Sequence, residues 1–148
     1  AVISSWISEI MRDTEPPPEE RDLVLFRNVL IYLRPEVHPR ALMRMYEAGV
    51  PLILATDGDG AGWEAHEEIA DMVLAGVSPA DAIVAATSNA ARLLRLYDLG
   101  TVADGMSADF VVLDANPLDD IKNTRAISNV YIRGEELDRT AMAEDWTS

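Results

Sequence analysis

Apolar residues recur at helical spacing over most of the first 97 residues of the chain. The pattern predicts helices over about residues 18–33, 39–48, 63–75 and 89–96, and another that begins at Pro79. Gly49 and Gly76 follow two of these segments, as glycine does where a helix ends. Ser78 and Pro79 fit the N-cap and first helical position, and Glu67 lies early in its helix, where the dipole favours carboxylates. The first two thirds of the chain are therefore predicted to be mainly helical.

Residues 50–56, VPLILAT, interrupt this helical rhythm with a short apolar run. Such a run is typical of a strand buried on both faces, as in a parallel sheet, and we predict the strand at about 51–56. Beyond Gly100, β-prone segments at 110–113 and 129–132 flank a turn region. The pattern predicts an α/β chain with helices and one strand in residues 1–99, an accessory sheet in 100–138 and a tail over 139–148.

Composition narrows the classes of partner. The chain has 148 residues, 49% of them hydrophobic, which is enough for a packed core. A formal charge of −14 argues against nucleic acid and anionic membranes as partners. No apolar run approaches the roughly 18 residues of a membrane span. The absence of cysteine excludes disulfides and thiolate metal sites, and is compatible with a cytoplasmic protein. Because the chain opens on β-prone Ala1-Val2-Ile3 without methionine, we expect a fragment of a longer protein.

The stretch DGDGAGWEAHEE at 57–68 invites two interpretations. The calcium-loop template D-x-[DN]-x-[DN]-G-x5-E finds acids at Asp57, Asp59 and Glu68. It is mismatched at Ala61, where it needs an oxygen ligand, and at Glu64, where paired loops carry an apolar residue. The preceding segment is also strand-like, whereas a calcium loop of this kind follows a helix. A non-catalytic acidic domain with a calcium loop remains the alternative function.

In the second interpretation, Asp57 is a catalytic carboxylate at the end of a buried strand, where α/β barrels bind their ligands. The surrounding sequence resembles the amidohydrolase superfamily of metal-dependent hydrolases, in particular its imidazolonepropionase-like and prolidase-like branch. The resemblance covers about residues 40–138. It rests on AGVPLILATD (48–57), His66, AGVSPADAI (75–83), AATSNAARLL (85–94), DLGTVADGMSADFVVL (98–113) and NPLDDI (116–121).

The resemblance implies that residues 51–56 form the eighth strand of a (β/α)8 TIM-type barrel. The chain would be the carboxyl-terminal part of that barrel, from about the end of strand 7, together with strands of a small accessory β-sandwich. In the family, the aspartate at this position binds the metal and acts as general base, which is the role implied for Asp57. His66 would line the substrate pocket. Trp63 would pack either on the substrate or on the barrel rim, and we expect the rim. The substrate would be a small amide or peptide with a scissile C–N bond, and the divalent metal would be zinc.

The family's other metal ligands are absent from this sequence, in which His38 is the only histidine besides His66. A catalytic zinc needs about three protein ligands, so one carboxylate cannot hold it. We therefore expect the 148-residue chain to be inactive alone and to need the remainder of the barrel. Because part of a barrel exposes apolar strand edges and helix faces, we also expect it to form homo-oligomers. The loops that would determine substrate identity follow strands outside this sequence.

Overall fold

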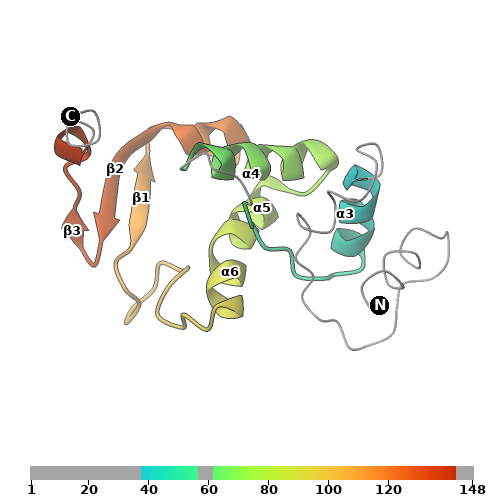
Figure 1. The fold of residues 1–148 in the computed structure, drawn as a ribbon, viewed down its shortest axis with the longest axis horizontal. Coiled ribbons are helices and arrows are strands. Elements are labelled where there is room, and N and C mark those ends of the chain that lie inside the picture. Colours follow the sequence, from blue (N-terminus) through green and yellow to red (C-terminus); the bar gives the residue numbers. More distant parts are fainter. Residues whose placement is uncertain (1–37, 57–61, 143–148) are drawn as a thin grey trace.

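The structure is a computed structural model that describes residues 38–56 and 62–142 (Figure 1). Four α-helices come first, and a small sheet with a 3-10 helix follows. In chain order the elements are α3 (His38–Glu47), α4 (Trp63–Ala75), α5 (Pro79–Ala86), α6 (Ser88–Leu93), β1 (Phe110–Leu113), η2 (Ile121–Arg125), β2 (Ile127–Ile132) and β3 (Glu135–Glu136). The predicted helix at 18–33 lies outside the described residues.

Local chemistry fixes most helix boundaries where the sequence predicted them. Gly76 has φ 116°, and the amides of Gly76 and Val77 donate to the carbonyls of Val73 and Met72, which closes the end of α4. Gly49, with φ 71°, ends α3 through the same pair of bonds. Ser78 caps α5 by accepting a hydrogen bond from the amide of Asp81 at 3.1 Å. The predicted helices at 39–48, at 63–75 and from Pro79 are confirmed.

The last predicted helix is shorter than expected, because α6 ends at Leu93 and not near Leu96. Arg95 adopts φ 59°, the left-handed conformation that Gly49 and Gly76 adopt after their helices. The amides of Arg95 and Leu96 donate to the carbonyls of Arg92 and Ala91. A non-glycine residue thus closes this helix. Because the sequence has no glycine at this position, it did not indicate the earlier helix end.

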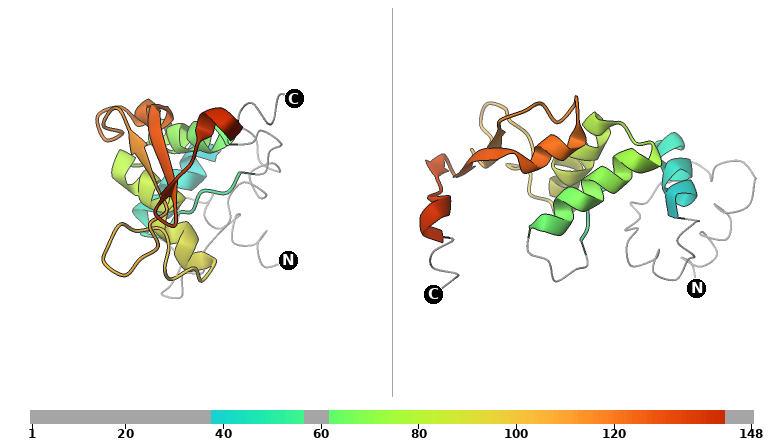
Figure 2. Two further views of the ribbon diagram at one scale, coloured as in Figure 1. Left: turned by 90° about the vertical axis from the view of Figure 1, so that its left-hand side faces the viewer. Right: turned by 90° about the horizontal axis from the view of Figure 1, so that it is seen from above.

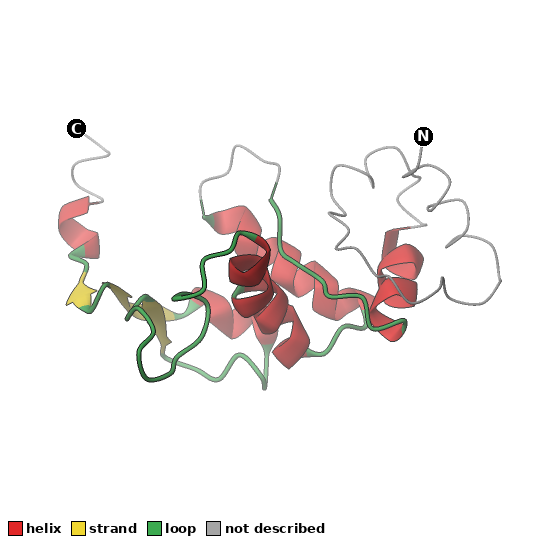
Figure 3. Ribbon diagram, turned by 90° about the horizontal axis from the view of Figure 1, so that it is seen from below, coloured by secondary structure: helices red, strands yellow, loops and turns green. Residues whose placement is uncertain are grey.

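The predicted strand at 51–56 is absent, since these residues form an irregular segment (Figure 3). Its predicted burial is confirmed for Leu52 and Ile53, which are at most 9% exposed, whereas Pro51 and Thr56 at its two ends are exposed. In the described part of the chain, the backbone of this segment forms hydrogen bonds with helical residues and not with a strand. The Leu54 amide donates to the Ala85 carbonyl at 3.1 Å, and Asn89 Nδ2 donates to the Leu52 carbonyl at 2.9 Å. A strand needs a neighbouring strand for its ladder, and the described residues around this segment are helical.

The core lies where α4, α5, η2 and the 50–56 segment meet. Its buried residues are Leu52, Ile69, Met72, Val77, Ala82, Ala85 and Ile121. Ala82 and Ala85 are fully buried, so α5 approaches its neighbours closely through small side chains. No helix in the part of the chain that the structure describes is long and apolar enough to cross a membrane.

The accessory sheet is confirmed as three antiparallel strands in the order β1-β2-β3, at one end of the elongated chain (Figures 1 and 2). Phe110 pairs with Tyr131, and their rings stack with centroids 4.7 Å apart. Phe110, Val111 and Ile132 are exposed. The described residues thus supply one sheet layer, and the second layer of the expected sandwich would come from outside them.

The segment predicted as a tail from residue 139 is ordered over the part that is described. Residues 139–142 are helical, and Asp138 Oδ1 accepts hydrogen bonds from the amides of Thr140 and Ala141. Arg139 Nη1 donates to the Ile127 carbonyl at 2.7 Å. These contacts attach the turn to β2.

Gly100 is expected to be essential for the packing of α6. At φ +81°, a Cβ on residue 100 would lie 2.8 Å from Ala91 Cβ and 2.9 Å from the Thr87 carbonyl oxygen. Gly105 has the same φ, but nothing lies within 4 Å of its Cβ position. Gly105→Ala should therefore cost only the backbone strain, about 1 kcal/mol, whereas Gly100→Ala should cost at least about 2 kcal/mol because overpacking adds to it. Urea unfolding of both variants measures the difference, and equal losses would contradict the packing.

The exposed apolar side chains predict that the 148-residue chain associates with itself. Leu74 and Val102 are 87% exposed, Tyr97 is 75% exposed, and the sheet adds Val111 at 51%. Apolar side chains exposed to this extent lose contact with water when a second molecule covers them, which favours association. Sedimentation velocity should detect dimers or larger species at micromolar concentration. A monodisperse monomer with a cooperative melting transition would contradict this expectation.

Candidate functional site

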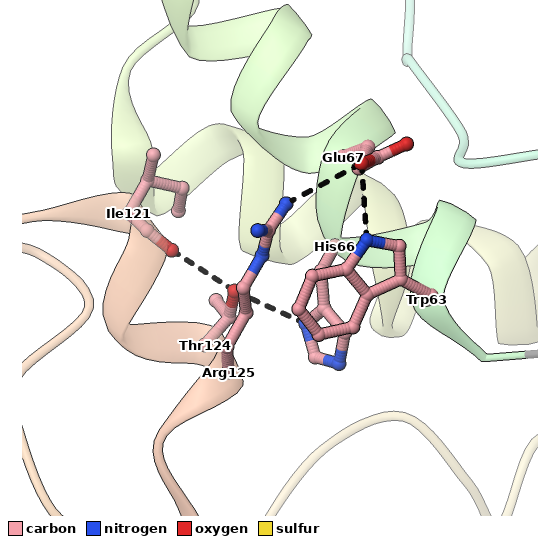
Figure 4. Close-up of polar contacts among 6 residues, drawn as sticks. All are labelled: Trp63, His66, Glu67, Ile121, Thr124 and Arg125. Carbon is pink, nitrogen blue, oxygen red and sulfur yellow. Dashed lines mark hydrogen bonds and ion pairs between the residues drawn. The ribbon is translucent and has the colours of Figure 1, made fainter.

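The candidate site lies where the first turns of α4 meet η2 (Figure 4). Ile69 of α4 and Ile121 of η2 are buried in the same core, so hydrophobic packing holds the two helices together. The turn before η2 is organised by side chains. Asp120 Oδ1 accepts from the Lys122 amide at 3.0 Å, and Asn123 Nδ2 donates to the Asn116 carbonyl at 2.9 Å. The NPLDDI stretch thus directs η2 onto α4.

A continuous hydrogen-bonded chain links His66 to the backbone of η2. His66 Nδ1 lies 3.1 Å from Thr124 Oγ1, and that hydroxyl donates to the Ile121 carbonyl at 2.9 Å. Thr124 is 9% exposed and His66 is half-buried. The two bonded residues are 58 positions apart in sequence, so the contact depends on the packing of α4 against η2.

Beside this chain, Trp63, Glu67 and Arg125 form a second polar group on the same face. The Arg125 guanidinium lies over the Trp63 ring, with Cζ 4.2 Å from the centroid. Trp63 Nε1 donates to Glu67 Oε1 at 3.0 Å, and Arg125 Nη2 lies 3.9 Å from the same oxygen. Because Glu67 is 55% exposed, the ion pair contributes little to stability and serves mainly to orient the two side chains.

The surroundings of His66 favour its neutral form. Burial lowers the pKa of the imidazole below 6.5, and the positive charge of Arg125 lowers it further. A neutral imidazole carries a proton on one nitrogen and a lone pair on the other, so at neutral pH it can both donate and accept a hydrogen bond. The site therefore presents a polar, uncharged group beside an aromatic ring.

Of the predicted site residues, His66 and Glu68 lie on α4, whereas Asp57 and Asp59 lie outside the described residues. Within residues 38–56 and 62–142, no three His, Cys, Asp or Glu side chains gather in a way that could hold a metal ion. The described residues therefore do not form a metal centre by themselves. The calcium alternative also requires a helix entering the loop, and residues 51–56 are not helical.

Thr124 and Arg125 were missed by the sequence analysis. They follow the end of the NPLDDI stretch by three and four residues, and that stretch was interpreted as a turn and as part of the family resemblance. No local spacing joins them to Trp63, His66 or Glu67, since the partners lie on different elements. An alignment in which positions 66 and 124 vary together would be the signal able to reveal such a contact from sequence.

The comparison with protein families decides to which family this arrangement belongs. The model of the amidohydrolase family matches residues 25–137 of the chain. The chain belongs to the amidohydrolase family. The matched region includes the apolar 50–56 segment, residues 57–61, α4 and η2.

Individual relatives support this assignment over parts of their length. The chain is 41% identical over 73 residues to an imidazolonepropionase of Anaeromyxobacter sp. (strain K), a match covering 47% of this chain and 17% of the relative. It is 33% identical over 103 residues to an ochratoxinase of Aspergillus niger, covering 66% and 22%. The crystal structure of phenylurea hydrolase B superposes with a TM-score of 0.64 and 30% identity, covering 82% of this chain and 33% of that one. The chain thus spans a third or less of each.

Acidification should destabilise the fold through His66. Because the folded-state pKa is lowered, the unfolded chain takes up the proton first as the pH falls below 6.5. The stability that neutral His66 contributes is complete above that pH and is lost as the pH falls toward the lower folded-state pKa. The free energy of unfolding of the unsubstituted protein, minus that of its His66→Gln variant, should therefore decrease as the pH falls from 8 to 5. Denaturant unfolding at each pH measures it.

The second histidine provides the control. His38→Gln leaves His66 in place, so this variant should show the same decrease relative to a His38→Gln/His66→Gln double variant. A pH-independent difference in both pairs would show that His66 titrates alike in the folded and unfolded chain.

Proposed function

We propose that the complete protein is a metal-dependent amidohydrolase that hydrolyses the C–N bond of a small amide or peptide-like substrate. The observation that carries the proposal is the family match over residues 25–137, which includes Asp57 directly after a buried apolar segment. The names of the family and of phenylurea hydrolase B denote amide and urea substrates, which share the C–N bond.

The activity is proposed for the complete protein, because the matched relatives are much longer than the region they share with this chain. The chain spans 17% of the imidazolonepropionase and 22% of the ochratoxinase. We propose that residues 51–56 occupy the position of the eighth barrel strand and that the remaining strands come from the rest of the protein. The 148-residue chain alone would then be inactive.

We propose Asp57 as general base and as one ligand of a divalent metal, with zinc as the family-based choice. Because the described residues contain no further set of metal ligands, the others would have to come from outside them. As general base, the Asp57 carboxylate would accept a proton from the attacking water while the water oxygen bonds to the carbonyl carbon. Transfer of that proton to the leaving nitrogen would accompany cleavage of the C–N bond.

His66 is proposed as a substrate-binding residue. It lies on α4, the helix that follows Asp57 in sequence, and its ring contacts the exposed Trp63 edge-on with centroids 6.5 Å apart. A half-buried neutral imidazole beside an exposed aromatic ring is suited to bind a polar, uncharged group such as an amide.

Asp57→Asn in the complete protein should reduce kcat at least about a hundredfold, because the amide side chain cannot accept the proton. Asp59→Asn is the matched control in the same loop and should retain most of the activity. The measurement is turnover in a screen of amides, ureas and dipeptides, with circular dichroism to verify folding. Near-normal kcat for folded Asp57→Asn would refute the assigned role.

The same two variants separate the hydrolase from the calcium alternative. A calcium loop uses both acids, so each variant should then weaken terbium luminescence excited through Trp63 to a similar extent. Absence of a signal that saturates at micromolar terbium would remove that alternative.

A further inference from the structure

The hydrogen bonds of Thr124 restrict the protonation of His66. A threonine hydroxyl has one proton to donate, and Thr124 donates it to the Ile121 carbonyl at 2.9 Å. His66 Nδ1, 3.1 Å from the same oxygen, then has to be the donor of the bond that joins them. The alternative would turn the hydroxyl proton toward His66 and remove this bond from the Ile121 carbonyl.

A neutral imidazole with its proton on Nδ1 has a lone pair on Nε2. In Figure 4, Nδ1 of His66 points to Thr124, and Nε2 lies on the opposite side of the ring, away from η2. Burial and the nearby Arg125 keep the imidazole neutral by lowering its pKa, so the lone pair persists at neutral pH. The Trp63 ring lies edge-on to the imidazole, at 66° to its plane.

We propose that Thr124 is a positioning residue that holds His66 in the Nδ1–H tautomer, so that Nε2 accepts a hydrogen bond from the ligand. The acceptor role rests on the proposed function, since it assumes that His66 faces the substrate. The tautomer rests only on the contacts of α4 with η2.

The tautomer determines which chemical group of a ligand fits this position. A lone pair binds an N–H or O–H donor and is repelled by a carboxylate or carbonyl oxygen. We infer that a substrate directs a donor at His66, as the N–H of a primary or secondary amide or of a urea does. A tertiary amide with no other donor would leave Nε2 without a partner.

The first experiment is an NMR measurement of the tautomer, which needs no substrate. The complete protein is labelled with 15N-histidine, and two-bond proton–nitrogen correlations are recorded at about pH 8, where histidine is neutral. The His66 signals are identified by their loss in His66→Gln. We expect a protonated-type Nδ1 and an unprotonated-type Nε2. Protonation of Nε2, or an equal mixture of tautomers, would overturn the proposal.

Two substitutions of Thr124 test its role in this preference. Thr124→Val removes the hydroxyl at nearly constant volume and should shift the signals toward the other tautomer, whereas Thr124→Ser should retain the parent pattern. An unchanged pattern in folded Thr124→Val would show that Thr124 does not position His66. For an amide that the complete protein hydrolyses, Thr124→Val should raise KM about two- to tenfold, and Thr124→Ser should restore it.

The two proposals can fail separately. If no amide or urea is turned over while the Nδ1–H tautomer is observed, the hydrolase fails and the positioning by Thr124 stands. If turnover is found with Nε2 protonated, the hydrolase stands and the acceptor role of His66 is wrong.

Discussion

Burial of one face of α4 is the constraint on which the rest of the described structure depends. Ile69 and Met72 lie on that face and share a core with Leu52, Val77 and Ile121. Each of these partners belongs to a different segment, so α4 is the element that joins them in one core. Because α4 is held at this position, its first turns and η2 come close enough for side chains to bond. The polar site is thus a consequence of hydrophobic packing elsewhere on the same helix.

The polar contacts at the start of α4 differ in what they do. The bond from His66 to Thr124 is part-buried and continues through the buried Thr124 hydroxyl to the Ile121 carbonyl, so it fixes a ring orientation. The contacts of Trp63, Glu67 and Arg125 are more exposed and are screened by solvent. They contribute little to the stability of the fold and mainly orient these three side chains at the surface. The combination gives a neutral, oriented imidazole beside an aromatic ring and a cation. Such an arrangement is suited to bind a polar organic molecule.

Residues 50–56 show how the same sequence can satisfy burial without a sheet. Val50, Leu52 and Ile53 are buried, but the backbone groups of Leu52 and Leu54 bond to Asn89 and to the end of α5. A buried backbone has to find partners, and here side-chain and helix-terminal groups supply some of them. The match to the amidohydrolase family rests on the sequence of this segment and its neighbours. It therefore holds although the segment forms no hydrogen bonds with a neighbouring strand within the described residues.

The sequence by itself determined the features that depend on near neighbours in the chain. Helix ends at Gly49 and Gly76, the Ser78 cap, and strands at 110–113 and 129–132 follow from backbone freedom, capping and β-propensity, which act over a few residues. The structure begins the second strand two residues earlier, at Ile127. The family resemblance likewise came from sequence order. Only the tertiary structure decided that residues 51–56 lack a ladder, that Arg95 replaces a glycine at a helix end, and that Thr124 bonds His66. Each of these depends on which groups a folded chain brings together across tens of residues, and local propensity does not contain that information.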